Sequence, residues 1–396
     1  MRHKFKLWQV VLAGINVLSL TAALILTAAG GSAAKHREYD QAALRWSGGE
    51  GGYTQMSVFF TEDSGVDKNG IEAIKAGLRS ELRSASIEQE PGKTLIPDAC
   101  SAEVGTFTAR GSGNTRSEVL MTAVSGSFFM FRSFDLLSGA YFTDSDIMHD
   151  GAVIDSELAW DLFGSDDVAG MTLRINDVPF YISAVIAAPS DKTEKKCAGK
   201  TRRIYVSYEG ASAVSGSAPA DSSSGTRSSA DSKDSKVPEA MPAESISADF
   251  SKVSTYECIV PDPVKDFAKN ALKKQLKTSC KSKYEMVVNT RRYDPTVRAK
   301  AFSDLSALTV KKVPVAFPYW ENASRITEMW LTFIYFARRL ALVIPVLTLL
   351  WLIAKGYILL KKNKQRIKSS AAGYFTQLWG KLSKKEDKPT ARKEKI

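Results

Sequence analysis

The chain has 396 residues, of which 44% are hydrophobic and 24% are charged, and it carries a formal net charge of +11. This length suffices for two ordinary domains or for one elaborated domain. The basic excess lies at the two ends, with +3 in residues 1–6 and +10 from Lys355 onwards, so the long middle carries about −2. This distribution does not favour a nucleic-acid-binding protein, and we expect no nucleic-acid partner.

Two apolar runs are long enough to cross a bilayer, which takes about 20 apolar residues. The first run is residues 7–29. The second lies within 329–360, where Arg338 and Arg339 separate an aromatic lead-in from an apolar span at 340–360. We therefore expect two transmembrane helices.

The basic residues give the expected orientation. They precede the first span, in residues 1–6, and follow the second, in residues 361–396. By the positive-inside rule both termini are cytoplasmic and residues 30–328 are extracytoplasmic, in a protein of the cell membrane. The alternative is a cleaved signal peptide, since small residues follow the first run, although that run exceeds the usual core of about 7–15 residues. Whether the first span is retained stays open.

The four cysteines all fall between the two spans: Cys100, Cys197, Cys258 and Cys280. An even number in an oxidising compartment predicts disulfides. We favour a bridge between Cys258 and Cys280 because both flank one predicted helix. Sequence alone does not choose among the possible pairings, and free buried thiols are the alternative.

The first part of the ectodomain, residues 55–210, follows a tether at 30–54. Short β-branched or aromatic runs closed by turn residues predict strands, and apolar residues at helical spacing predict helices. The strands are expected at 55–60, 103–109, 118–124, 152–154, 171–175, 179–187 and 204–208. One helix, at 67–83, carries an apolar face of Ile71, Ile74, Leu78 and Leu82. A second begins at Asp155 or Ser156 and ends at Gly164.

The composition changes at residues 211–249, which are mostly Ser, Ala, Asp, Pro and Gly. Such a segment cannot bury a core, and we expect it to be disordered. Order returns in the second part of the ectodomain, residues 250–328. Its expected elements are strands at 255–260 and 283–289, a helix carrying Val264, Phe267, Ala271 and Leu272, and a helix at 294–308. The fold class is therefore an α+β ectodomain flanked by two transmembrane helices.

The basic tail, residues 361–396, contains one apolar helical face made of Ile367, Ala371, Tyr374, Phe375, Leu378, Trp379 and Leu382. Lysines and polar residues occupy the other positions. This pattern predicts an amphipathic helix that binds the anionic lipids of the inner leaflet. A docking helix for a cytoplasmic partner is the alternative.

The ectodomain lacks the residue types that usually perform catalysis. Apart from His36 beside the membrane, the ectodomain has one histidine, His149, which is expected to be a solvated loop residue and is not enough for a catalytic triad or a histidine metal site. The nearby Asp144, Asp146 and Asp150 lack the ligand spacing of a calcium loop. Two Gly-Lys-Thr tripeptides lack the upstream glycine of a phosphate-binding loop. We expect no enzyme activity, no catalytic or metal-ligating residue and no cofactor; an ectoenzyme is the least favoured of the functions considered.

Two consecutive blocks carry a recognisable pattern, VSGSFFMFRSFDLLSGAYFTDSD at 124–146 and GAVIDSELAWDLFGSDDVAGMTLRINDVPFYISAVI at 151–186. The matching residues are Phe129, Leu137, Gly139, Phe142 and Asp146 in the first block, and Leu158, Ala159, Leu162, Phe163, Gly164, Gly170 and Ile175 in the second. They resemble the extracytoplasmic core domain of MacB/FtsX-type ABC transporter permeases. The chain departs from that pattern at Ala140, where the family has Arg, and at Ala184-Val185, where it has Gly-Val. The matching residues form turns, caps and core contacts, so their role is structural.

The resemblance implies a place in an ABC-type transport or mechanotransmission system. Permeases of that family have four spans and a cytoplasmic segment that contacts an ATPase, whereas two spans are predicted here. We therefore expect an accessory or divergent permease-like subunit whose ectodomain binds a partner or couples ATP-driven motion outside the cell. Its partners would be an ABC ATPase subunit, a multi-span permease, or both. The alternative is a stand-alone membrane-anchored extracellular binding or regulatory module, for example of cell-wall enzymes, with no ATPase.

Overall fold

The computed structural model describes residues 7–35, 40–49, 51–89, 94–216, 251–280, 283–304 and 313–386. The chain divides into two units. Unit 1 comprises Met1–Ala29 and Ile334–Ile396, and unit 2 comprises Gly30–Phe333. Unit 2 is the ectodomain, a mixed α/β structure.

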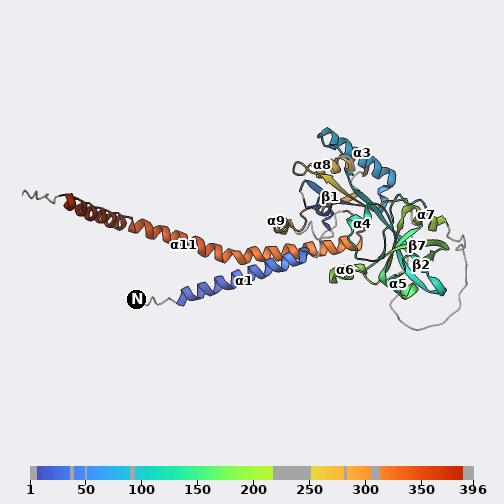
Figure 1. Ribbon diagram of the computed structural model, residues 1–396, viewed down its shortest axis with the longest axis horizontal. Helices are drawn as coiled ribbons and strands as arrows, with labels where there is room; N and C mark the ends of the chain where they lie inside the picture. Colours follow the sequence, from blue (N-terminus) through green and yellow to red (C-terminus); the bar gives the residue numbers. More distant parts are fainter. Residues whose placement is uncertain are drawn as a thin grey trace, which may run out of the picture. The chain divides into compact units, whose positions relative to one another are not determined.

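One twisted sheet forms the framework of unit 2 (Figure 1). Its strands lie in the order β10 (Tyr284–Val288), β1 (Tyr53–Phe60), β9 (Thr255–Pro261), β2 (Asp98–Arg110), β3 (Arg116–Gly126), β8 (Arg202–Ser207), β5 (Gly151–Asp155), β7 (Val178–Ile186) and β4 (Leu136–Gly139). The pairs β3–β8 and β5–β7 are parallel, and the other pairs are antiparallel. The sheet thus joins the first and second parts of the ectodomain into one body.

A tenth strand, β6 (Thr172–Ile175), pairs with both β7 and β2. The strands β2, β3, β8, β5, β7 and β6 therefore close into a ring, which leaves fewer open edges. The β6–β7 connection is a turn at Asn176 and Asp177, between the two predicted strands, and their φ angles of 48° and 66° suit a tight hairpin turn. Met121, Ile154 and Ile182 are fully buried in the core of this ring.

Two helices cover one face of the other half of the sheet, α3 (Lys68–Ser84) and α8 (Phe267–Cys280) (Figure 1). Asp67 caps α3 by accepting a hydrogen bond of 2.8 Å from the backbone N–H of Gly70. The predicted apolar face is fully buried: Ile71, Ile74, Leu78 and Leu82 are each at most 2% exposed. Val264 is instead 68% exposed, because the chain enters α8 only at Phe267.

The remaining predicted helices differ mainly at their ends. Helix α5 (Ser156–Phe163) is capped by Asp155 and ends at Gly164, as expected. The predicted helix at 294–308 is α9 (Pro295–Ala301) followed by the short turn η4 (Phe302–Asp304), and residues 305–308 lie outside the described residues. Short elements complete the described part of unit 2: α2 (Ala42–Trp46), η2 (Glu62–Ser64), η3 (Ser112–Asn114), α4 (Phe128–Phe131), α6 (Lys192–Ala198) and α7 (Tyr208–Gly216).

Helix α7 corrects the predicted boundary of the disordered insertion. Its Ala211 and Val214 are fully buried in the core, which explains why residues 211–216 are helical despite their small-residue composition. The rest of that predicted segment, residues 217–249, lies outside the described residues. The tether also contains structure, since α1 continues to Lys35 and α2 buries Ala42 and Ala43.

The predicted bridge between Cys258 and Cys280 does not form, and both thiols are free. Cys258 lies in β9 and Cys280 at the end of α8, and each is buried as a small apolar side chain of the core. Flanking the same helix does not bring two sulfur atoms together. Burial raises the pKa of the Cys258 thiol well above its usual value and that of Cys280 to about 11.

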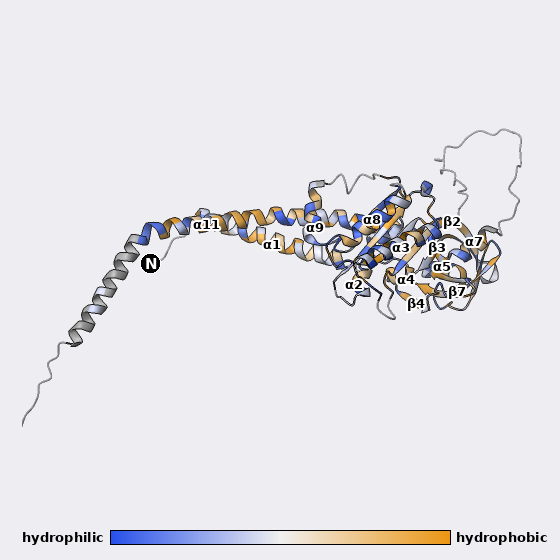
Figure 2. Ribbon diagram, turned by 90° about the horizontal axis from the view of Figure 1, so that it is seen from above, coloured by the Kyte–Doolittle hydropathy of each residue, from blue (hydrophilic) through white to orange (hydrophobic). Residues whose placement is uncertain are grey.

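Unit 1 contains the two helices that are long and apolar enough to cross a membrane, α1 (Leu7–Lys35) and part of α11 (Tyr319–Glu386). Both are mostly orange in the hydropathy view, over the length of α1 and the middle of α11 (Figure 2). They contact each other: the Thr348 hydroxyl donates to Asn16 Oδ1 at 2.7 Å, and Trp8 meets Trp351 edge to face. Polar contacts of this kind join helices within membranes.

Helix α11 is longer than the predicted second span. It begins at Tyr319 rather than near Met329, and Pro345 does not end it. Helical structure continues to Glu386, through the predicted amphipathic segment. Of the predicted apolar face in that segment, only the Trp379 side chain is described, and it is 73% exposed.

Candidate functional site at the root of helix α11

The sheet face opposite α3 and α8 carries buried polar side chains among apolar ones such as Phe59 and Ile259. Side chains alternate between the two faces of a strand, and on this face β1 and β9 place Ser57 and Glu257, which are 1% and 2% exposed. The Ser57 hydroxyl donates to Glu257 at 2.8 Å, and the Asn289 amide donates to Ser57 at 2.7 Å. A buried carboxylate therefore sits in the middle of the sheet.

The first part of α11, residues 319–333, belongs to unit 2, and we call it the helix root. It begins directly after Pro318, whose carbonyl accepts the N–H of Asn322. Tyr319 and Trp320 pack into an apolar cluster with Phe128, Tyr205 and other residues of the sheet. The buried residues of the root are Tyr319, Trp320, Glu321, Ala323, Ser324, Thr327, Leu331 and Thr332. The root is therefore part of the ectodomain core.

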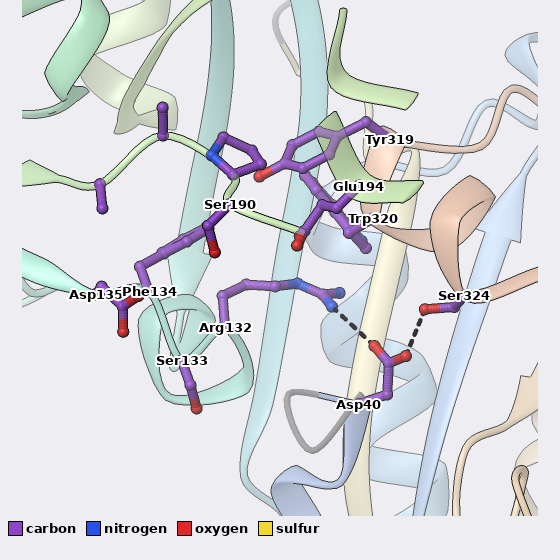
Figure 3. Close-up of a pocket in the computed structure, with 13 residues that line it drawn as sticks. Asp40, Arg132, Ser133, Phe134, Asp135, Ser190, Glu194, Tyr319, Trp320 and Ser324 are labelled. Carbon is purple, nitrogen blue, oxygen red and sulfur yellow. Dashed lines mark hydrogen bonds and ion pairs between the residues drawn. The ribbon is translucent and has the colours of Figure 1, made fainter. Parts of the chain in front are cut away.

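Arg132 connects the sheet to the helix root in a first group of charges, the Arg132 cluster (Figure 3). Its guanidinium donates to Glu257 and lies 3.9 Å from Asp40. Asp40 also accepts from Tyr293 at 2.6 Å and from Ser324 of the root. Burial, and then the nearby Asp40 charge, raise the pKa of Tyr293 well above its usual value, so its hydroxyl stays protonated as a donor.

A second group, the Arg292 cluster, lies on the same root. Arg292 makes a two-pronged ion pair with Glu321 at 2.8 and 2.9 Å and a further pair with Glu328 at 3.0 Å. Arg298 also pairs with Glu328, and Arg325 bonds Glu321 at 3.1 Å. Burial alone would lower the pKa of Arg292, but the Glu321 and Glu328 carboxylates outweigh it and hold the pKa above its ordinary value.

These clusters can hold the helix root in one position on the sheet. Taking charges out of water is costly, and the cost is recovered only when each charge has well-placed partners. Shifting α11 along its axis would separate Arg292 from Glu321 and Asp40 from Ser324 while leaving them buried. The polar face therefore favours a single docked arrangement.

A small hollow opens beside the Arg132 cluster (Figure 3). Its walls include Phe134, Pro189, Tyr319 and Trp320, and the Arg132 guanidinium lies 4.6 Å from the centre of the Trp320 ring. Burial raises the pKa of Tyr319 to about 12. Within the described ranges, no three His, Cys, Asp or Glu side chains converge in a way that could hold a metal ion. The chemistry of the site is hydrogen bonding and charge pairing.

Residues 48–240 match the family model of the MacB-like periplasmic core domain. The chain carries a MacB-like periplasmic core domain. Such domains occur in ABC-type transporter permease-like proteins, and with two candidate spans the chain is a membrane protein with an extracytoplasmic domain. No curated protein matches the chain.

Solved structures similar to the chain include three domains, each at 13% sequence identity. The extracellular domain of the noncanonic ABC-type transporter YknZ from Gram-positive bacteria covers 59% of this chain and 99% of its own, with a TM-score of 0.36. The periplasmic region of MacB from Actinobacillus actinomycetemcomitans covers 65% and 94%, with a TM-score of 0.37. A domain of a putative permease protein from Porphyromonas gingivalis covers 60% and 89%, with a TM-score of 0.31.

The aromatic and glycine positions of the MacB-like pattern lie at packing contacts and turns. Phe129 stacks on Tyr141 at 4.5 Å and meets Phe142 edge to face. Gly139, Gly164 and Gly170 have φ angles of 77°, 73° and 94°, which glycine adopts readily. At Gly139 a Cβ atom would lie 2.1 Å from the Ser183 carbonyl oxygen.

The other positions of the pattern are mostly core residues. Leu158, Ala159, Leu162 and Ile175 are buried and Phe163 is partly buried. Asp146 accepts hydrogen bonds from Thr143 in a turn rather than capping a helix. Leu137 is 48% exposed on β4, so it has no core role.

The sequence reasoning missed the charged residues of both clusters. Glu257 was a usable signal, since it is the one charged residue within the otherwise uncharged strand TYECIVP. A charge in the middle of a buried strand requires a partner. Which residues supply that partner is not visible in the local pattern.

Proposed function

We propose that this chain is a permease-like subunit of an ABC-type system and that its MacB-like ectodomain couples motion to a partner through α11. The observation that carries the proposal is the buried ion pairing at the helix root. It holds the start of α11 on the sheet, and the same helix continues through the candidate second span. A displacement of the helix would then move the ectodomain with it.

The orientation we propose has both termini in the cytoplasm. The basic residues at both ends of the chain support it. The contact between Trp8 and Trp351, with Lys355 4.6 Å from the Trp351 ring, supports one common membrane surface for the start of α1 and the end of the apolar run of α11. Tryptophan and lysine are enriched where helices reach the membrane surface. The helical tail to Glu386 would then contact either anionic lipids or the ATPase side of the assembly.

The test is purification of the full chain at native expression in gentle detergent, with crosslinking, followed by identification of the subunits recovered with it. We expect an ATPase subunit, alone or through a multi-span permease. Deleting residues 364–396 should reduce that recovery. The matched control replaces residues 217–249 with Gly and Ser of equal length, which leaves α7 and β9 in place, and it should not.

Two outcomes would contradict the proposal. If no ATPase is recovered even after crosslinking, the stand-alone extracellular module becomes the better explanation. A reporter that is active only in the cytoplasm should be active after Ile396 and silent at Ser223. Activity at Ser223 would reject the orientation.

A further inference from the structure

The outer edge of β10, the last strand of the sheet, is open. Asn289, directly after the strand, donates its backbone N–H to the Gln55 carbonyl at 2.9 Å. Backbone groups point to alternate sides along a strand, so the odd-numbered residues of β10 bond to β1 and the even-numbered ones face away from it. The latter are Tyr284, Met286 and Val288. Within the described residues β10 pairs with β1 alone, and these outward N–H and C=O groups make no hydrogen bond.

The strand carries none of the usual protection of an edge. Natural edge strands are often blunted by lysine, by proline or by a β-bulge. The sequence of β10 is YEMVV, and its register with β1 is regular. Its one charge, Glu285, is paired with Arg325 of the helix root. The edge is therefore able to pair with a further extended segment.

A hollow of about 230 Å³ lies beside this edge. Residues 285–288 form one wall, and the Arg292 cluster forms the rest through Arg292, Arg298, Arg325 and Glu328. One water needs about 15 Å³ on this measure, so the hollow has room for about 15 waters. Because α9 and the helix root stand beside the edge, the space suits one added strand rather than the edge of a second sheet.

A row of free positive charges lies on α8. Lys269, Lys273 and Lys277 are exposed and make no ion pair within the part of the chain that the structure describes. They are four residues apart, so they share one side of the helix. Helix α8 contains no Asp or Glu that could neutralise them. We call these three residues the lysine ridge.

The lysine ridge is on the side of α8 that overlooks the edge of β10. The side of α8 that faces α3 is marked by Lys274, which pairs with Glu81 at 2.6 Å. Helix α3 lies towards β2, since Lys75 pairs with Asp98 at 2.8 Å. Helix α8 contacts β1, the neighbour of β10. The side turned away from α3 is therefore the side of the open edge.

We propose that the edge of β10 binds an acidic, extended segment of a partner protein by antiparallel strand addition. Open backbone groups call for a peptide, because only another backbone matches their spacing. Side chains alternate between the faces of the added strand. Those on the α8 face are acidic and lie towards the lysine ridge, and those on the other face are apolar and enter the hollow beside Val287. The assignment does not rest on the proposed coupling role.

The experiment measures fluorescence anisotropy of labelled hexapeptides added to the full chain in nanodiscs of uncharged lipid. The probe alternates Glu and Val. The controls are an alternating Lys and Val peptide, and a peptide with three Glu followed by three Val. We expect the probe to bind at least tenfold more tightly than either control, because only the probe places every carboxylate on one face of a strand.

Backbone methylation of the probe tests strand addition without changing the protein. In the antiparallel register the residue opposite Met286 points its side chain to the α8 face, so the N–H groups of the glutamates face β10. N-methylation of the glutamates should weaken binding at least tenfold. N-methylation of the valines, whose N–H groups point away, should weaken it less. If the two methylated peptides bind equally well, strand addition in this register is overturned.

A protein variant tests the lysine ridge. Replacing the three lysines together, by Lys269→Gln, Lys273→Gln and Lys277→Gln, should weaken probe binding about tenfold, the combined effect of three exposed charge contacts. The control replaces three exposed lysines on and after α6 with the same change in net charge: Lys192→Gln, Lys196→Gln and Lys200→Gln. Equal weakening by both sets would overturn the role of the ridge.

The open edge is tested by Met286→Pro, which removes an outward N–H and leaves the bonds to β1 in place. It should abolish probe binding, and if it does not fold the methylated peptides decide the question. Equal binding of the Lys and Val peptide would overturn the acidic assignment. Absence of probe binding would overturn the proposal. Dimers of the chain that Met286→Pro abolishes would also overturn it, and would assign the edge to a second copy.

Discussion

The two faces of the β1–β9 region are stabilised in different ways. One face is covered by α3 and α8 and is apolar, with Leu78 and Leu276 fully buried. The other is covered by the root of α11 and is crossed by arginine–carboxylate pairs around Arg132 and Arg292. Apolar burial is non-directional and tolerates small shifts. Paired charges in the core do not tolerate such shifts, because each would be left buried without its partner. The face that carries them therefore determines the position of the root of α11.

The role of the paired charges is tested most directly at Arg292. Arg292→Met leaves Glu321 buried and less compensated, and we expect the free energy of unfolding to fall by about 3–5 kcal/mol. The double variant Arg292→Met with Glu321→Leu should recover most of that loss, since Arg298 still pairs with Glu328 and Arg325 with Glu285. Urea unfolding of the full chain in nanodiscs, followed by near-UV circular dichroism, measures both.

The control for that pair is Lys274→Ala. Lys274 pairs with Glu81 at 2.6 Å, but its side chain is 69% exposed. Loss of an exposed pair should cost less than about 1 kcal/mol. If Arg292→Met costs no more than Lys274→Ala, the polar face does not hold the helix root.

The apolar face should respond to loss of volume. Leu78→Ala removes a fully buried side chain between α3 and the sheet and should cost about 2–5 kcal/mol in the same urea experiment. In contrast to Arg292, no charge is left unpaired, so a second truncation at Leu276 should add to the loss rather than relieve it. Recovery of stability in the double variant would contradict the distinction between the faces.

Asp155 sharpens the comparison because it is a buried carboxylate held mainly by backbone donors. It accepts from the N–H groups of Leu158 and Arg203, each at 2.7 Å. Burial raises its pKa to about 6, against the lowering effect of those bonds. Because the folded-state pKa is raised, this contribution to stability is complete below about pH 4 and is lost as pH rises through about 6.

The measurable consequence is a slope in stability against pH. Between about pH 4 and pH 6 the Asp155 contribution should decline by roughly 2–3 kcal/mol. Asp155→Asn cannot ionise and should remove that part of the slope. The control is Asp161→Asn: that carboxylate is 36% exposed and pairs with Arg202, which lowers its pKa, so its own titration lies below the range from about pH 4 to pH 6. An unchanged slope in Asp155→Asn would assign the pH dependence to other groups.

The smallest expected effect concerns the thiols of the apolar face. Cys100, Cys258 and Cys280 are buried there, whereas Cys197 on α6 is partly exposed. Burial raises the pKa of the first three thiols, which suppresses the reactive thiolate. Alkylation of the folded chain should therefore modify Cys197 first, with little change in stability. If peptide mapping without reductant recovers the Cys258 and Cys280 peptides joined, the predicted disulfide is correct and these thiols are not free.

Local sequence patterns were sufficient to predict those elements whose conformation depends on residues close together in the chain. The period of Ile71, Ile74, Leu78 and Leu82 predicted the buried face of α3, because residues three and four apart share one side of a helix. The two apolar runs likewise predicted helices of membrane-spanning length. The turn before β7 and the ends of α5 followed from Asn-Asp, Asp155 and Gly164.

Only the tertiary structure decided which buried charges meet. Arg132 and Glu257 are 125 positions apart, and Ser324 and Asp40 are 284 apart, so no window of sequence contains both partners. Burial of Ala211 and Val214 made α7 helical in a segment whose composition predicted disorder. Burial in the apolar core also accounts for Cys258 and Cys280, which pack there as separate side chains with free thiols. In each case the energy comes from contacts across the fold, and those exist only once the sheet has assembled.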